Sequence, residues 1–243
     1  MPVSSGGGAA TASGANYQSS VAAYLVLSVI CDFDIELFGS NRPTAIRFET
    51  ANPVDDINVS FGQQPTAYLQ VKRALSFSVS PDQEFYKCLG QFVRQWIADK
   101  HIHSLVLVTT SESSKRLTVA LPAIIAAIGS GSEADFRRDQ NKSLVCDLDL
   151  MLGMLQSIYE SHLGKPLPRD DAIAILKKIR VFTLDLSTGS SVEQAIYIIL
   201  NAKGCRSPSL FWGKLIGLLV VCGVAKNVVE RVYPRALRKT PLD

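Results

Sequence analysis

The sequence predicts an α/β fold in which helices flank a mixed central sheet, followed by a mainly helical second half. Three observations lead to this prediction. Polar and apolar residues alternate with period two on both sides of residues 62–65, as expected for a β-hairpin. Residues 81–100 carry an apolar stripe at helical spacing, and the apolar run 104–110 is typical of a buried strand. Past residue 110, most segments have helical patterns.

The predicted elements can be followed in order along the chain. Residues 14–30 place apolar side chains at helical spacing, with Ser13 available as a cap. Residues 44–50 alternate as a strand does, the hairpin follows, and Pro81 suits the first turn of the helix over 81–100. Further helices are expected over 115–130, 143–163, 169–179, 191–203 and 208–233, with one strand over 180–186. We therefore expect a flexible tail (1–13), a core (14–112) and a mainly helical extension packed on that core (113–243).

The composition is that of a folded chain that can bury a core. Of its 243 residues, 47% are hydrophobic and 19% charged, which argues against disorder. The net charge of +3 is too small to identify a nucleic-acid partner by itself. The 5 cysteines lie far apart without a C-x-x-C pair. We therefore expect buried single thiols in a reduced, cytoplasmic chain, and no zinc site.

Neither end of the chain has the pattern of a targeting segment. Residues 1–13 are mostly small and carry no charge, unlike a signal peptide. The most apolar stretch, 215–225, is about half as long as the roughly 20 residues of a membrane span, so no membrane association is expected. The basic carboxyl end stops without a clear terminal element, which suggests that further domains follow.

The hairpin carries the residues on which a functional prediction depends. Period two puts the acid Asp56 on one face of its strand, and Gln70 and Lys72 on one face of the next. The Asp56 carboxylate, the Gln70 amide oxygen and the Val71 carbonyl would be enough protein ligands for Mg²⁺, with Mn²⁺ as an alternative. Lys72 would orient the attacking water or stabilise the charge on a phosphate. Asp55 competes with Asp56 for the metal, and a purely structural ion pair between Asp56 and Lys72 is the other interpretation.

A row of polar side chains follows on the helix over 81–100. Lys87, Gln91 and Arg94 are spaced four and three residues apart, so they lie on one exposed face. Taken alone, this row is a solvated helix face. Beside a hydrolytic site, the row and the neighbouring Arg73 become candidate contacts for the phosphates of DNA.

The segments "PVDDI" and "YLQVKR", preceded by a helix with "YQ" and followed by an amphipathic helix, resemble the PD-(D/E)xK restriction-endonuclease-like superfamily in its variant with Gln as the second acid. The spacing of these segments is most similar to the double-stranded DNA endonuclease domain of CD-NTase-associated antiphage effectors and related NTPase defence proteins. By this resemblance, Asp56 matches the metal-binding acid, Gln70 the second metal position and Lys72 the catalytic lysine. Gln18 stands where many members carry an acid on the first helix, and Glu49 is a further acid nearby.

The resemblance implies a restriction-endonuclease-like core over residues 14–112 and a Mg²⁺-dependent endonuclease that cuts double-stranded DNA. It also implies an effector domain of a bacterial antiphage protein, active as a homo-oligomer, whose sensor or NTPase domain lies outside this sequence. The alternative is a catalytically disabled module of the same fold that binds DNA or oligomerises through apolar helices such as 208–225.

Overall fold

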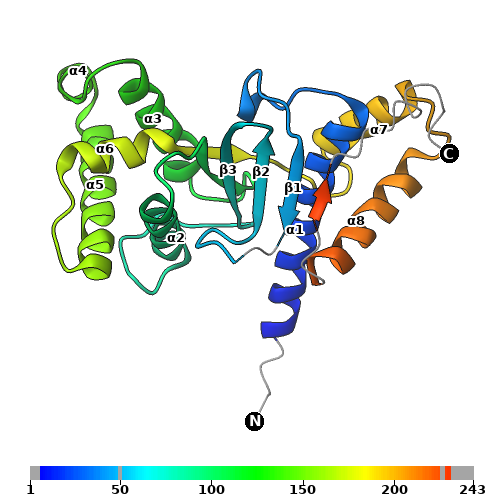
Figure 1. Ribbon diagram of the computed structural model, residues 1–243, viewed down its shortest axis with the longest axis horizontal. Helices are drawn as coiled ribbons and strands as arrows, with labels where there is room; N and C mark the ends of the chain where they lie inside the picture. The colour runs from blue at the N-terminus through cyan, green and yellow to red at the C-terminus, as the bar shows by residue number, and fades with distance from the viewer. Residues whose placement is uncertain (1–5, 49–50, 225–227, 231–243) are drawn as a thin grey trace, which may run out of the picture.

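The computed structural model describes residues 6–48, 51–224 and 228–230. In these ranges, a six-stranded mixed sheet lies between two groups of helices (Figure 1), which confirms the predicted α/β class. The elements in chain order are α1 (Gly6–Cys31), η1 (Glu36–Phe38), β1 (Ala45–Phe48), β2 (Ile57–Phe61), β3 (Gln64–Val71), α2 (Glu84–Ala98), β4 (Ser104–Thr109), η2 (Arg116–Ala120), α3 (Leu121–Ser130), α4 (Glu133–Asp139), α5 (Lys142–Leu163), α6 (Arg169–Lys178), β5 (Ile179–Thr183), α7 (Ser191–Ala202), α8 (Pro208–Val224) and β6 (Val228–Glu230).

The strand order of the sheet is β5-β4-β3-β2-β1-β6. Strands β3, β4 and β5 run parallel, whereas β3, β2, β1 and β6 pair antiparallel. Strand β3 therefore joins the two halves of the sheet, with Leu69 opposite Ile57 on one side and Gln70 beside Leu107 on the other. Toward the carboxyl end of β3, the backbone is paired with β2 as far as Leu69 and with β4 as far as Val71.

The hairpin between β2 and β3 turns at Gly62, whose φ of +71° is a conformation that favours glycine. Strand β3 begins at Gln64, so it includes Pro65, which the sequence places in the break between the strands. The register shifts between Val59 and Phe61. Proline is tolerated at such a bulge because a bulge interrupts the regular ladder of hydrogen bonds.

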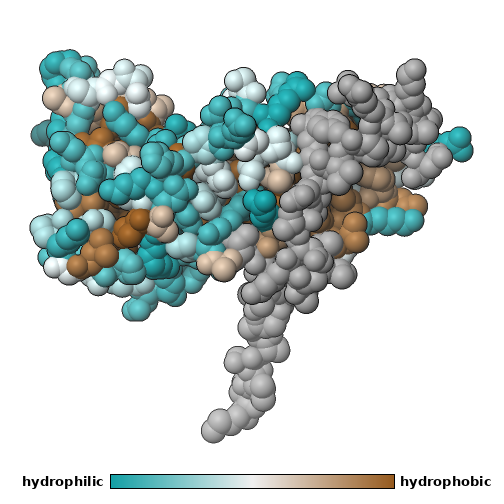
Figure 2. Space-filling model, in the orientation of Figure 1, coloured by the Kyte–Doolittle hydropathy of each residue, from teal (hydrophilic) through white to brown (hydrophobic). Residues whose placement is uncertain are grey.

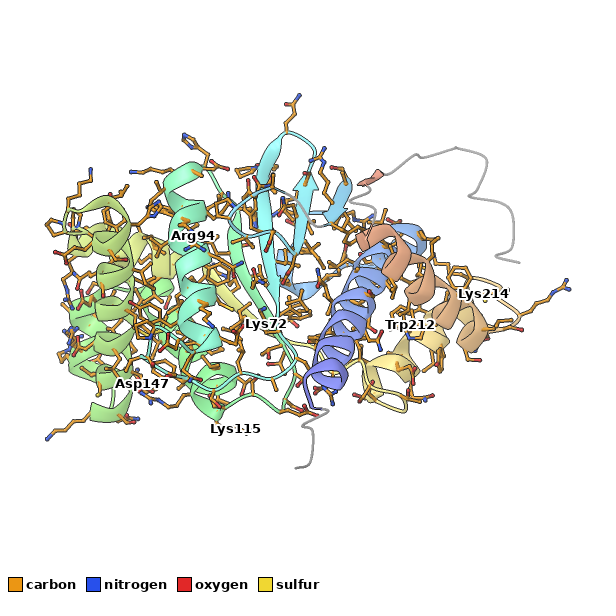
Figure 3. The ribbon with its side chains drawn as sticks, turned by 90° about the horizontal axis from the view of Figure 1, so that it is seen from below. Lys72, Arg94, Lys115, Asp147, Trp212 and Lys214 are labelled. Atoms are coloured by element: carbon orange, nitrogen blue, oxygen red, sulfur yellow. The ribbon has the colours of Figure 1, made fainter. Side chains whose placement is uncertain are left out.

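Alternation along the strands sends side chains to two separate hydrophobic clusters. Tyr68 and Leu107 belong to a cluster with residues of α2, α3, α5 and α6. Leu69 and Val106 belong to the second cluster, with residues of α1, α7 and α8. The two groups of helices consequently cover opposite faces of the sheet (Figure 3). Because Gln70 follows Tyr68 by two residues, its side chain lies on the α2 face.

Helix α2 begins at Glu84, three residues later than the sequence predicts. Gln83 is its N-cap residue, and the Gln83 N–H donates to the Ser80 carbonyl in a turn. The prediction from Pro81 was therefore wrong, because the segment before α2 forms a turn and Pro81 lies in it. The apolar stripe is buried as predicted, with side chains of α2 such as Phe85, Leu89 and Phe92 in the core.

The structure differs from the sequence prediction at both ends of the chain. Helix α1 begins at Gly6, inside the range predicted as a flexible tail, where the alanines at 9, 10 and 12 favour a helix. Helix α8 ends at Val224 rather than extending to residue 233. Val228–Glu230 instead forms β6, which pairs with Ala45–Arg47 of β1. The two β-branched valines suit a strand, and the edge of β1 is available to pair with them.

The second half of the chain adds to the core rather than standing apart from it. Strand β5 pairs with β4, and residues of α2 share one hydrophobic cluster with residues of α3, α5 and α6. The short helix α4, which the sequence prediction missed, is capped by the Ser132 hydroxyl, which accepts from the Asp135 N–H. At seven residues it is too short for a clear apolar period to appear in the sequence.

Apolar side chains reach the surface along α8 (Figure 2). Leu210 is 57% exposed and Leu218 is 59% exposed. Within the described residues, none of the helices combines the length and the apolar character that crossing a membrane requires. Among the cysteines whose side chains the structure describes, Cys31, Cys88 and Cys205 are buried thiols and Cys146 is exposed.

Candidate active site

The structure brings Asp56 and Gln70 together at the carboxyl end of β3. Asp56 directly precedes β2, and its Oδ2 accepts a hydrogen bond of 2.6 Å from Nε2 of Gln70. The same oxygen accepts a second hydrogen bond, of 2.7 Å, from the backbone N–H of Val71. Asp56, which directly precedes β2, is thereby held against the carboxyl end of β3.

Gln70 contributes a buried oxygen that lacks a partner within the described residues. The residue is 2% exposed, and Oε1 has no hydrogen bond there. An unsatisfied buried acceptor costs about 1–3 kcal/mol, and a bound water or ion is one way in which such a group is satisfied. The amide nitrogen is occupied by Asp56, which leaves the oxygen as the atom that could receive a ligand.

A cation bound beside these residues would have few protein ligands. The described residues contain no group of three or more His, Cys, Asp or Glu side chains that could hold a metal ion. A site here would thus depend on one carboxylate, that of Asp56, together with the orphaned oxygen of Gln70 and the carbonyl of Val71. Mg²⁺ accepts such a set because it prefers oxygen ligands and keeps several of its waters.

The second acid, Asp55, lies against α2. Its Oδ1 accepts a hydrogen bond of 3.3 Å from Nε2 of Gln91. One turn further along α2, Oε1 of the buried Gln95 accepts from the backbone N–H of Val54 at 3.4 Å. Two glutamines of α2 therefore hold the loop that carries the acids, and Gln91, expected to contact DNA, is engaged by Asp55.

Lys72 has a different partner from the one that its strand position suggests. Its Nζ lies 3.5 Å from Oε2 of Glu84, the first residue of α2, so the ion pair of Lys72 joins β3 to α2 and does not cross the hairpin to Asp56. The other Glu84 oxygen, Oε1, lies 3.2 Å from Nζ of Lys87. The hydrogen bond from Lys87 is the largest cause of a lowered pKa of Glu84, and the charge of Lys72 lowers it further.

The sequence pattern did not identify Glu84 as a site residue. The three-residue spacing to Lys87 was the only available signal, and it says nothing about Lys72. The buried Cys88, one turn along α2, is close enough to Asp56, Lys72 and Glu84 for their charges to act on its thiol. Burial is the largest effect and raises the pKa of Cys88 to about 12, so the thiol stays protonated.

Hydroxyl groups after β4 hold the backbone that follows Lys72. The Lys72 N–H donates to the Val108 carbonyl at 2.9 Å, continuing the parallel ladder past the end of β3. The Thr110 hydroxyl donates to the Arg73 carbonyl at 2.6 Å, and the Ser113 hydroxyl accepts from the Leu75 N–H at 2.8 Å. These hydroxyl groups belong to the run "TTSESS" (109–114), which the sequence analysis did not connect with the site.

The remaining predicted residues are more widely dispersed. Gln18 is half-buried on α1, which packs in the cluster on the face opposite Gln70, and Glu49 lies outside the described residues. Arg73 pairs with Glu112 at 3.2 Å. Arg94 lies back over Gly90, where a Cβ would come within 3.4 Å of its Nη1. Figure 3 shows Lys72 beside α2 and Arg94 further along the same helix.

Comparisons with known proteins assign no family. No family model matches the chain, and no curated protein matches it. A solved structure to which the chain is similar is the Moraxella osloensis Cap4 SAVED/CARF-domain containing receptor, with a TM-score of 0.48 and 13% sequence identity. The match covers 90% of this chain and 45% of that one, so the chain spans less than half the length of that receptor. At this score and identity, the likeness assigns neither a family nor a function.

Proposed function

We propose that this chain is a metal-dependent endonuclease that hydrolyses phosphodiester bonds of double-stranded DNA. One observation carries the proposal. The Asp56 carboxylate accepts from Gln70 at the end of β3, and this leaves a buried Gln70 oxygen with no partner within the described residues. A lysine follows two residues later on the same face, as the resemblance to PD-(D/E)xK nucleases requires.

The roles of the residues follow from their chemistry. Asp56, Oε1 of Gln70 and the carbonyl of Val71 would hold Mg²⁺ or Mn²⁺. When bound, such an ion neutralises charge on phosphoryl oxygens and lowers the pKa of a water. The ammonium group of Lys72 supplies a positive charge and hydrogen-bond donors to the phosphate undergoing attack, or orients the water.

DNA contacts are assigned to the cations around this site. Lys87 and Arg94 lie on α2, and Arg73 follows Lys72 directly. Neutralising DNA phosphates releases counterions, so these side chains would make binding depend on salt. Gln91 is left out of the phosphate contacts because its amide nitrogen is used by Asp55.

The biological setting is proposed from the sequence resemblance alone. It comprises an effector domain in antiphage defence, a sensor or NTPase domain elsewhere in the protein, and a homo-oligomeric active state. The exposed Leu210 and Leu218 on α8 are consistent with a contact between copies.

Plasmid cleavage tests the proposal. Supercoiled plasmid is incubated with the wild type, Asp56→Ala or Lys72→Ala in Mg²⁺ and, separately, in Mn²⁺, with size-exclusion light scattering to record the oligomeric state. We expect nicking and linearisation by the wild type and none by either variant. Lys214→Ala on α8, a lysine on the opposite side of the sheet, serves as the matched control and should cut normally.

Two outcomes would contradict the proposal. Equal cutting by the wild type and both variants would place the active site elsewhere. DNA binding that weakens with salt, with no cleavage in either metal by monomer or oligomer, would instead support the catalytically disabled DNA-binding module.

A further inference from the structure

We propose that Glu84 is a positioning residue that holds the ammonium group of Lys72 at the end of β3 for phosphodiester hydrolysis. The inference rests on the proposed nuclease function. It also assigns a residue that neither the sequence pattern nor the resemblance identifies. The observation behind it is the distance of 3.5 Å between Nζ of Lys72 and Oε2 of Glu84.

Lys72 needs such a partner because only its backbone is fixed by the sheet. The Lys72 N–H donates to the Val108 carbonyl. Its side chain, in contrast, is 35% exposed, and the ammonium group stands at the end of a flexible four-carbon chain. The ammonium group can therefore occupy many positions unless a second group restrains it. Among the described residues, Glu84 is the carboxylate that forms an ion pair with it.

Glu84 is suited to this task because each of its oxygens has a separate contact. Oε1 accepts a hydrogen bond of 3.2 Å from Lys87, one turn further along α2, and Oε2 faces Lys72. Glu84 also begins α2, where the unpaired N–H groups of the first turn favour a negative charge. The carboxylate is thus stabilised by its own helix while it pairs with Lys72.

Helix α2 relates Lys72 to the acid across the site. The same helix that carries Glu84 holds the acid loop through the contacts of Gln91 with Asp55 and of Gln95 with Val54. Helix α2 thus contacts Lys72 through Glu84, and it contacts the two residues that directly precede Asp56. A rigid support of this kind keeps two reacting groups in a defined relation.

The role predicts opposite effects on DNA binding and on turnover. Removing the Glu84 charge releases Lys72 and Lys87 from a competing anion, so DNA should bind as tightly as before or more tightly. The freed Lys72 would no longer be held in one place, and misplacing a reacting group by about 1 Å can cost about 100-fold in rate. A purely structural ion pair would leave the turnover rate unchanged, so kcat is the quantity that distinguishes the two roles.

The decisive variant is Glu84→Gln, which keeps the size of the side chain and removes its charge. We expect kcat for plasmid cleavage to fall about 10- to 100-fold, with KM unchanged or lowered. Glu84→Asp keeps the charge on a shorter side chain and should recover part of the lost kcat. Asp82→Asn removes a negative charge two residues away that has no ion pair within the described residues, and it should behave as wild type.

A second measurement reports on the Lys72 side chain without requiring cleavage. Brief treatment with an amine-reactive ester, followed by peptide mass spectrometry, gives the labelling rate of each lysine. Glu84→Gln should raise the rate at Lys72 several-fold relative to Lys142 and Lys214, while Asp82→Asn should not. Circular dichroism and thermal unfolding check that each variant is folded.

The two proposals can fail separately. Wild-type cutting with an unchanged kcat in Glu84→Gln, or an unchanged Lys72 labelling rate, would overturn the role of Glu84 and leave the nuclease function standing. A wild type that never cuts overturns the nuclease function and with it the positioning role, even if the labelling rate shows that the ion pair exists.

Discussion

The side-chain nitrogen of Gln70 lies 2.6 Å from Oδ2 of Asp56, and in the proposed site this contact would allow a glutamine to stand at the second metal position. A second acid at this distance would set two negative charges against each other unless a cation or proton separated them. The amide donates to Asp56 through its nitrogen and keeps its oxygen for another partner. In the proposed site, this hydrogen bond would hold the two side chains together before any ion binds.

Asp56→Asn should reduce plasmid cleavage by at least about 100-fold, since loss of groups that merely support a metal ligand already costs 10- to 100-fold. Asp55→Asn is the matched control, because its amide oxygen can still accept from Gln91, and it should retain activity within about tenfold. Initial rates of plasmid nicking measure both. An equal loss in the two variants would show that Asp55 shares the metal.

Gln70→Leu should abolish cleavage while changing the free energy of unfolding by only about 1 kcal/mol. The variant loses a hydrogen bond to a charged acceptor, which contributes about 1.5–3 kcal/mol, but it also removes an unsatisfied buried oxygen that costs about 1–3 kcal/mol. Urea unfolding gives the stability. Retained cleavage, or destabilisation well above 3 kcal/mol, would contradict a ligand role for this oxygen.

Gln95→Leu should destabilise the protein by about 1–3 kcal/mol, because the buried Val54 N–H loses its acceptor. Cleavage should also fall, since the acid loop loses one of its two contacts with α2. Gln91→Ala, at a less buried position of the same helix, should cost under about 1.5 kcal/mol. Chemical unfolding of both variants tests this order, and a larger cost at Gln91 would show that the loop is held mainly through Asp55.

Stability should fall in acid where Glu133 becomes protonated. Hydrogen bonds from Arg169, chiefly, and Arg137 lower the pKa of Glu133 from its ordinary 4.5 to about 2. A lowered pKa means that the stabilisation is complete above about pH 4.5 and is lost as the pH falls toward 2. Because Arg169 is partly exposed to solvent, which weakens the interaction, we expect the Glu133 charge to contribute about 1–2 kcal/mol to the free energy of unfolding.

Urea unfolding of the wild type and Glu133→Gln between roughly pH 6 and pH 2.5 measures this contribution. The stability difference between the two proteins should shrink as the pH falls. A difference independent of pH would mean that the Glu133 charge does not stabilise α4 against α6.

Lys87→Ala and Arg94→Ala should each weaken DNA binding similarly for all sequences. Each should also reduce the slope of log affinity against log salt by about 1, because one fewer phosphate is neutralised. Fluorescence anisotropy at several salt concentrations gives the slope. Gln91→Ala does not change the charge and serves as the control. An unchanged slope in both Lys87→Ala and Arg94→Ala would show that this face of α2 does not contact DNA.

Local patterns in the sequence were sufficient for much of the fold. Period two located the hairpin, because side-chain direction in a strand depends only on position, but Asp56 directly precedes β2 and Lys72 directly follows β3. The apolar stripe located α2. Short or weakly patterned elements were missed, namely α4 and β6, because β6 depends on pairing with the distant edge of β1 and α4 spans only about two turns.

The choice of partners within the site was decided by the tertiary structure alone. Nothing near Lys72 in the sequence indicates that its ion pair is with Glu84, or that Gln91 contacts Asp55. Those contacts depend on how α2 lies over the sheet, which the packing of its buried face against Tyr68, Leu105 and Leu107 determines. The sequence determined which chemical groups reach one face of the hairpin, and long-range packing determined which of them are held and by what.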